Sequence, residues 1–318
     1  MKKTLLVLMC FSLLLVFSCT QPKEAVEEEA PAENVVMEES AETQSTFSNE
    51  EHPIDQPLKL GFDMGFIPYH YFSESGEALG FGIEVSKEVA KRLGRPDIDI
   101  VDVNWSGIFS GMFAGQYEAI LFSINITQER SEMMDFTEPF MASPQMLIAR
   151  EADVAQYAAP NDLKGKKLAV SSGSVVDTWG IEASKKYDFE VVRYDKIDDA
   201  VMALLLKKID VVGLNVSTAD NFIKEKEGLG RAFTISMPAD YALGYQAMGF
   251  ATRKDDPFRY ELEKVLEGMK MDGTLQKIME PYFGKVSPED YANIVFTGYG
   301  CPGIRAYEPE AFHKPIMP

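Results

Sequence analysis

A single arginine, Arg130, follows a buried apolar run and a short polar turn in the sequence Ala119-Ile-Leu-Phe-Ser-Ile-Asn-Ile-Thr-Gln-Glu-Arg130. The apolar run predicts a strand, and the helix that carries Arg130 begins where this strand stops. A guanidinium at the end of a strand suits a ligand carboxylate, because two parallel charge-assisted hydrogen bonds fix both affinity and orientation. We therefore predict a carboxylate-binding site here. A surface arginine paired with Glu129 or Glu132 is the alternative.

The sequence offers little for catalysis or metal binding. Among the histidines, we expect His70 to be structural, and we expect His52 and His313 to lie in a tether and a tail. No serine–histidine–acid set and no metal-ligand spacing stands out. We expect neither a cofactor nor a metal.

Residues 1–19 have two lysines followed by an apolar run of about fifteen residues, which is typical of a secretory signal peptide and too short for a stable transmembrane helix. The segment ends in Val16-Phe-Ser-Cys19, which resembles a bacterial lipobox. Lipidation of Cys19, palmitate included, would anchor the protein to a membrane, because two or more acyl chains anchor stably. A plain signal peptide with a chance cysteine is the alternative.

Residues 20–56 are rich in Glu, Ala, Pro, Ser and Thr, and they carry over half of the net charge of −19. Because low apolar content and high net charge cannot offset the chain entropy, we predict a disordered acidic tether. The remaining body is moderately acidic, which argues against nucleic acid as a partner.

Three cysteines are present, and two belong to the leader. Cys10 leaves with the signal peptide and Cys19 is the proposed lipid site, so Cys301 alone remains. We therefore expect no internal disulfide and no cysteine metal cluster, and the folded part must depend on its apolar core.

The body alternates between strand and helix patterns, which indicates an α/β fold. The first cycle predicts strands at 58–63, 98–103 and 119–123 and helices at 83–94 and 108–115. The second cycle predicts strands at 168–170, 190–194, 209–214 and 244–252 and helices after 174, from 200 and at 257–271. This order is explained by two α/β lobes. The chain crosses between them twice, near Ser143-Pro144 and near Tyr241-Ala242. Their predicted bounds are 57–143 with 242–285 for lobe 1, 144–241 for lobe 2, and 286–318 for a C-terminal extension. The ligand cleft then lies beyond the strand ends.

Several short sequence segments, taken together and in order, resemble those of bacterial solute-binding protein family 3, the polar amino-acid-binding proteins of ABC transporters. Besides the run around Arg130, they are Gly61–Tyr69, Gly76–Val85, Asn104–Ile108, Asp162–Ser174, Met271–Ile278 and Tyr282–Gly284. The resemblance covers residues 58–284. It implies a two-lobed periplasmic binding protein fold of type II. It also implies a protein outside the cytoplasm, without catalysis, that captures an amino acid or related small carboxylate by lobe closure and delivers it to an ABC transporter permease.

The resemblance also implies a set of ligand contacts, with Arg130 gripping the ligand's α-carboxylate. The other matching positions are Ser123 and Asn125 beside Arg130, the aromatic pair Phe66 and Trp105 around the ligand side chain, Asp63 at its far polar end, and Ser174 and Val175 at a backbone turn that closes over the carboxylate. The alternatives are ordinary core aromatics for Phe66 and Trp105, and a turn cap for Asp63.

One position departs from the family pattern. Asn215 stands in Gly213-Leu-Asn-Val-Ser217 where the family has an aspartate that neutralises the ligand's α-ammonium. An amide accepts a hydrogen bond from an ammonium but does not neutralise it, and a buried uncompensated cation is costly. Either the α-amino group is absent or modified, or another acid substitutes, with Asp63 and Asp240 as the candidates.

Two other functions stay open. The same fold hosts dehydratases, which need an acid in the cleft for proton transfer, although Asn215 removes the obvious one and we expect no other paired acid there. The second is a ligand sensor that acts through a membrane receptor.

Overall fold

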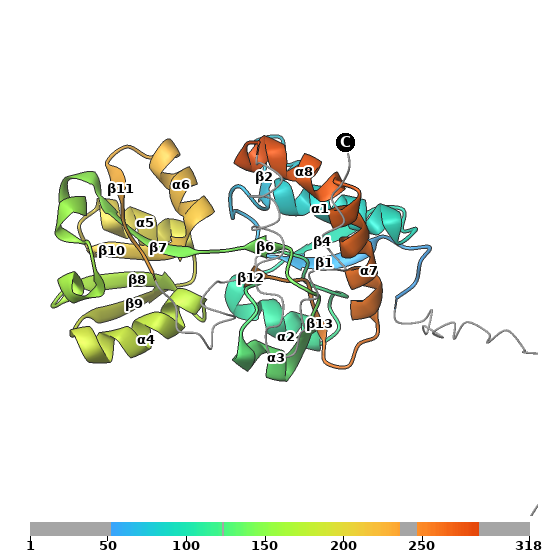
Figure 1. The fold of residues 1–318 in the computed structure, drawn as a ribbon, viewed down its shortest axis with the longest axis horizontal. Helices are drawn as coiled ribbons and strands as arrows, with labels where there is room; N and C mark the ends of the chain where they lie inside the picture. Colours follow the sequence, from blue (N-terminus) through green and yellow to red (C-terminus); the bar gives the residue numbers. More distant parts are fainter. Residues whose placement is uncertain (1–51, 123, 236–246, 286–318) are drawn as a thin grey trace, which may run out of the picture. The chain divides into compact units, whose positions relative to one another are not determined.

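The computed structural model describes residues 52–122, 124–235 and 247–285 (Figure 1). Some predictions concern residues outside these ranges: the signal peptide with Cys19, the tether up to residue 51, Ser123, the second crossing near Tyr241-Ala242, Asp240, and the C-terminal extension with Cys301 and His313. Within the described ranges, no helix has the length and apolar character needed to cross a bilayer.

Short strands linked by bridges form the centre of the first lobe. Strand β1 (Leu58–Phe62) pairs in parallel with β4 (Ile98–Asp102). In place of the predicted strand at 119–123, Ala119 bridges β1 and Ile120 bridges β13 (Ala251–Arg253). Strand β13 in turn pairs with β5 (Met134–Phe136) in antiparallel orientation. Two small pairs complete the lobe: β2 (Tyr71–Phe72) with β3 (Ala78–Leu79), and β6 (Met141–Ala142) with β12 (Ala247–Met248).

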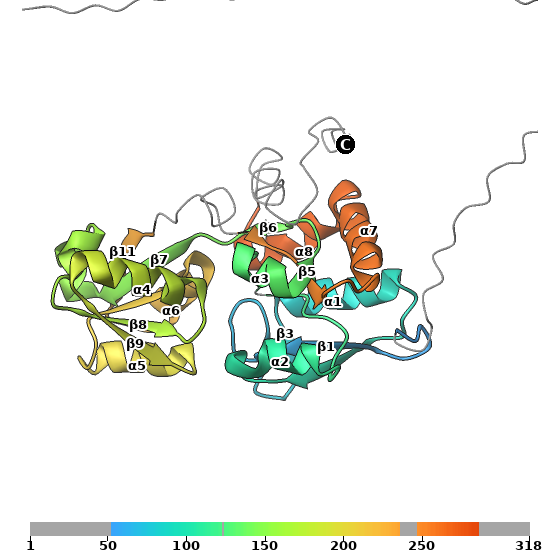
Figure 2. The same cartoon turned by 90° about the horizontal axis from the view of Figure 1, so that it is seen from below.

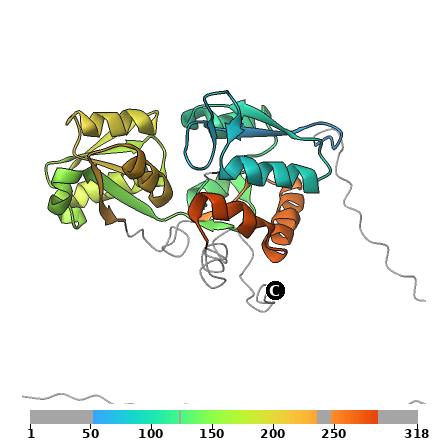
Figure 3. The same ribbon diagram turned by 90° about the horizontal axis from the view of Figure 1, so that it is seen from above.

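Helices cover these strands. They are α1 (Phe81–Arg92), α2 (Ile108–Phe113), α3 (Gln128–Met133), α7 (Phe258–Met271) and α8 (Thr274–Phe283), with a 3-10 turn at Trp105–Gly107. Helix α1 forms because Val85 and Val89 share one apolar face, and both are fully buried. The late helices α7 and α8 pack beside α1 (Figure 3), so the chain returns to the first lobe after it has built the second.

The second lobe is a five-stranded sheet in the order β11-β7-β10-β8-β9. Its strands are β7 (Gln145–Arg150), β8 (Lys167–Ser171), β9 (Glu190–Tyr194), β10 (Val211–Asn215) and β11 (Leu229–Thr234). Strands β8, β9 and β10 run in parallel, whereas β7 is antiparallel to both of its neighbours. The carboxyl ends of the three parallel strands therefore meet at one edge of the sheet.

Both faces of this sheet are covered. Helix α4 (Val175–Tyr187) packs on one face, and α5 (Ile197–Leu205) and α6 (Val216–Glu225) pack on the other (Figure 2). Two 3-10 turns, at Glu151–Gln156 and Pro160–Leu163, follow β7. Each parallel strand leads into a helix start, which places helix N-termini along the edge where the strands end.

The chain joins the first lobe earlier than the sequence predicts, because His52 is buried rather than part of a tether. Its Nδ1 lies 2.8 Å from Glu118 Oε2 and its Nε2 lies 3.2 Å from Asp256 Oδ1. The imidazole also stacks on Phe258 with ring centroids 4.3 Å apart. We call these four residues the His52 clasp. Composition averaged over residues 20–56 is dominated by the upstream glutamates, so it misses this contact.

The His52 clasp contains a charged histidine. Burial lowers the pKa of His52, but hydrogen bonds to Asp256 and Glu118 outweigh it and raise this pKa to about 9. Because the folded-state pKa lies above the ordinary value of 6.5, the stabilisation from protonation is fully present below pH 6.5. It is lost as the pH rises through about 9.

Replacing His52 with alanine should lower the free energy of unfolding by roughly 1–3 kcal/mol at pH 7, because Glu118 and Asp256 lose their shared cation while each keeps an arginine partner. Urea denaturation at pH 7 and pH 10 measures this, and the difference from the wild type should shrink at pH 10. Lys91→Ala is the control, since its ion pair with Glu88 is exposed and should matter by less than about 0.5 kcal/mol. An equal loss at both pH values would show that the buried imidazole is neutral.

Candidate functional site

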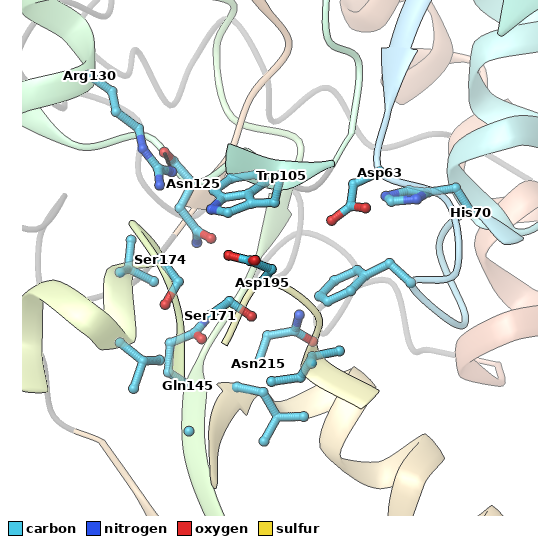
Figure 4. A pocket seen from close by; sticks show the side chains of 16 residues that line it. Asp63, His70, Trp105, Asn125, Arg130, Gln145, Ser171, Ser174, Asp195 and Asn215 are labelled. Atoms are coloured by element: carbon cyan, nitrogen blue, oxygen red, sulfur yellow. Dashed lines mark hydrogen bonds between the residues drawn. The ribbon is translucent and has the colours of Figure 1, made fainter. Parts of the chain in front are cut away.

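A cavity lies beyond the carboxyl ends of the second lobe's parallel strands and is lined from both lobes (Figure 4). The described members of the predicted ligand set all line it: Asp63, Phe66, Trp105, Asn125, Arg130, Ser174, Val175 and Asn215. Ser123 lies outside the described residues. The structure thus brings together side chains that are up to 152 positions apart, from Asp63 to Asn215, in one cavity.

Arg130 is buried, with 7% of its surface exposed, which excludes the surface-arginine alternative. It lies on α3, a helix capped by Thr127, whose Oγ1 accepts the Arg130 backbone N–H at 3.2 Å. The guanidinium Nη1 donates to the Asn125 backbone oxygen at 2.8 Å, and Nη2 donates to the Gly173 backbone oxygen at 3.1 Å. A guanidinium presents its N–H donors in a rigid planar fork, so these two bonds fix its plane.

Aromatic rings surround the guanidinium. Its central carbon lies 5.3 Å from the Trp105 ring centroid and 5.2 Å from that of Phe109. Trp105 and Phe66 are both half-buried and line the cavity, so neither is a plain core residue. An aromatic wall excludes water and strengthens charge interactions beside it.

The start of α4 forms the second lobe's side of the cavity. Ser174 is its N-cap, and its Oγ accepts the Asp177 backbone N–H at 3.1 Å. Asp177 in turn accepts the Gly173 N–H at 2.9 Å and pairs with Arg193. Gly173 has φ +70°, a left-handed conformation that favours glycine, and this turn aims its carbonyl at Arg130. Val175 begins the helix, where backbone N–H groups have no intrahelical acceptor and suit an anion.

Asp63 follows β1 and lies beside His70 in the cavity (Figure 4). Burial raises the pKa of Asp63 to about 6, and the like charge of Asp102 adds to this shift. A hydrogen bond from the Trp105 backbone and the charge of Lys196 oppose it. Burial lowers the pKa of His70 to about 4, so its imidazole is neutral at pH 7. An ionised Asp63 in this place suits a cationic group.

Asn215 ends β10 and caps α6, because its Oδ1 accepts the Thr218 backbone N–H at 2.9 Å. It is 7% exposed. The capping hydrogen bond therefore fixes the Asn215 amide, which also lines the cavity. The amide carries no negative charge.

The sequence analysis missed several residues that line this cavity, among them Gln145, Asp195 and His70. No paired acid in the cleft suggested itself from the sequence, but Asp195 lines the cavity together with Asp63. Asp195 directly follows the correctly predicted strand at 190–194, so the rule that ligands bind beyond strand ends makes it one candidate among the residues at such positions. Gln145 begins β7, an element that the alternating pattern did not predict.

The two-lobed α/β fold and the cleft define a class, the solute-binding proteins, and comparisons with known proteins define the family. Residues 58–285 match the model of the bacterial extracellular solute-binding proteins, family 3, and the chain belongs to this family. The predicted family and fold class are therefore confirmed.

Named relatives are amino-acid-binding proteins. The chain is 27% identical to the L-arginine-binding protein of Pseudomonas aeruginosa over 232 residues, which is 72% of this chain and 88% of the relative. It is 28% identical to the histidine-binding periplasmic protein of Salmonella typhimurium over 233 residues, with the same coverage. Among solved structures, an ancestral arginine-binding protein bound to arginine superposes with a TM-score of 0.67 at 26% identity, covering 73% of this chain and 100% of the other.

Asp63 should titrate near pH 6 in the protein without ligand, and Asp102→Asn should lower its pKa because a like charge is removed. The folded state holds this proton more tightly than the unfolded state, so folding is favoured here as the pH falls through 6. Side-chain carboxyl chemical shifts measured by NMR against pH test both statements. Asp99→Asn, on the same strand β4 as Asp102, is the control and should leave the titration of Asp63 unchanged.

Proposed function

We propose that the protein captures an amino acid or a related small carboxylate outside the cytoplasm and delivers it to an ABC transporter permease. The observation that carries this proposal is the buried Arg130 guanidinium, which lines the cavity and is held by backbone carbonyls from both lobes. A carboxylate at this point would meet the Arg130 fork, the Asn125 amide and the first N–H groups of α4. The names of the relatives, which bind arginine and histidine, support an amino acid as ligand.

The proposed motion is closure of two lobes around the ligand. The proposed lobe bounds are 57–143 with 242–285, and 144–241, with His52 joined to the first lobe through its clasp, and the first crossing runs through Ser143 and Gln145. Ser143 is buried, and the Gln145 Nε2 donates to its backbone oxygen at 2.8 Å. A short, internally bonded crossing of this kind can turn as a hinge while the sheet that follows it moves as a unit.

A dehydratase-like enzyme is the second candidate function, because the cavity holds acids that proton transfer needs. The pKa of Asp63, raised by burial to about 6, suits an acid–base role near neutral pH, and Asp195 is a second carboxyl. Turnover of a prephenate-like acid by the purified protein would replace binding with catalysis as the function. A sensor that acts through a membrane receptor differs from a transport protein only in its partner, and co-purification with a permease separates the two.

Arg130→Lys should weaken binding of the amino-acid ligand by roughly 10- to 150-fold, because lysine keeps the charge but loses the fork. Titration calorimetry with a panel of L-amino acids measures the loss. Arg92→Lys makes the same change on α1, where the arginine pairs with Glu88, and should leave affinity unchanged. Unaltered affinity in Arg130→Lys would remove the carboxylate role from Arg130.

We also propose a lipid anchor at Cys19, which places the protein on the outer face of a cell membrane. Cys19→Ser should move the protein from the membrane fraction to the soluble fraction in fractionated bacterial cells that express the full chain. Cys10→Ser is the matched control, because Cys10 leaves with the signal peptide and its loss should not change the distribution. Membrane retention of Cys19→Ser would refute the anchor and leave ligand capture unaffected.

A further inference from the structure

We propose that Asp195 supplies the negative charge for the ligand's α-ammonium, the charge that Asn215 does not carry. The charge would then come from the end of β9 instead of the end of β10, two strands away along the edge of the same sheet. This inference rests on the proposed function, since it assumes that an amino acid occupies the cavity.

Asn215 is a poor partner for an ammonium for a geometric reason. Its single side-chain oxygen already accepts the Thr218 N–H at 2.9 Å as the cap of α6. The other end of the amide is an NH₂ group, which is a donor like the ammonium itself. An aspartate at this position would cap the helix with one oxygen and offer the second to a cation. The asparagine keeps the cap and loses that charged acceptor.

Asp195 has the properties needed to replace the charged acceptor that is missing at Asn215. It follows β9 and precedes α5, and its carboxylate points into the cavity (Figure 4). No hydrogen bond or ion pair from another described residue engages its side chain, so its acceptors stay available. The ion pairs formed at this end of β9 belong to Arg193 and Asp177 instead.

The sheet brings Asp195 and Asn215 to opposite sides of Ser171. Strand β8, which ends at Ser171, pairs in parallel with both β9 and β10, and Ser171 is in register with Tyr194. Strands two apart are separated by roughly 10 Å, so side chains that lean inward from both sides share the space above the middle strand. The small side chain of Ser171 leaves that space open.

Asp63 is less suited to this role. In Figure 4 it lies beside His70, across the cavity from Arg130, whereas the Asp195 carboxylate points into the space between Arg130 and Asp63. The α-ammonium of an amino acid is one carbon away from its carboxylate, so it must lie near Arg130. Asp63 is then left for the far end of the ligand. Among the described residues that line the cavity, the cation Arg130 is followed by the acids Asp195 and Asp63, which fits a ligand with an α-carboxylate, an α-ammonium and a cationic or polar end.

The test compares amino acids with analogues that lack only the α-amino group. The probes are L-arginine, L-lysine, L-histidine and L-glutamine, each with its des-amino analogue, measured by titration calorimetry on the folded protein. The wild type should bind at least one amino acid more tightly than its analogue. Asp195→Asn should weaken the binding of that amino acid by roughly 10- to 150-fold. It should change the affinity for the des-amino analogue by less than about threefold.

Two further variants sharpen the result. Asp195→Asn combined with Asn215→Asp returns the charge to the end of β10 and should restore most of the lost affinity. Asp198→Asn makes the same charge change in the first turn of α5, outside the cavity lining, and should have no effect. Thermal unfolding of each variant checks that it is folded. Asp195 is an exposed residue, so its substitution should leave the fold intact.

The outcomes separate this inference from the proposed function. Unchanged affinity in Asp195→Asn, or an equal loss for the amino acid and its analogue, refutes the role of Asp195. Tighter binding of a des-amino acid by the wild type refutes it as well, but keeps a small carboxylate as the ligand. If neither these probes nor any member of the wider panel of L-amino acids and small carboxylates binds, the proposed function fails and this inference fails with it.

Discussion

The guanidinium of Arg130 is the group on which the cleft depends. One of its nitrogens bonds to a carbonyl of its own lobe, at Asn125, and another bonds to a carbonyl of the second lobe, at Gly173. Carbonyls accept from the guanidinium N–H groups and so fix its plane and its direction in the cavity. The glycine conformation at 173, the cap at Ser174 and the ring of Trp105 all act on the position of this one group.

Two helix starts contribute polar side chains to the cavity. Ser174 and Asn215 line it as the N-caps of α4 and α6, and each side chain accepts a backbone N–H from its helix. Structure and ligand contact are therefore coupled at these positions, because a substitution there changes a helix end together with the cavity. Asn215 illustrates the coupling, since it keeps the capping bond while it changes the charge that the cavity presents.

Local pattern predicted much of the second lobe, because each of β8, β9 and β10 is a short apolar run followed by a helix start. It missed β7, which lies antiparallel between β10 and β11 and continues from the crossing without a helix of its own. The sequence predicted Arg130, Trp105 and Asp63 because each lies in a segment that resembles the family. Asp195 could not be identified by type alone, because an acid after a strand is common and only the sheet order shows that β9 borders the cavity. His52 was missed because its partners, Glu118 and Asp256, are distant in sequence.

The His52 clasp also has a mechanical consequence. Its partners stand just before the Ala119 bridge and at the start of α7, so all of its contacts belong to the first lobe. A pull on the chain from before residue 52 is therefore carried into the strands and helices of that lobe alone. Neither the second lobe nor the crossing at Ser143 contributes a residue to the clasp. Tension on the N-terminal segment would therefore act on the first lobe and would not hinder the opening and closing of the cleft.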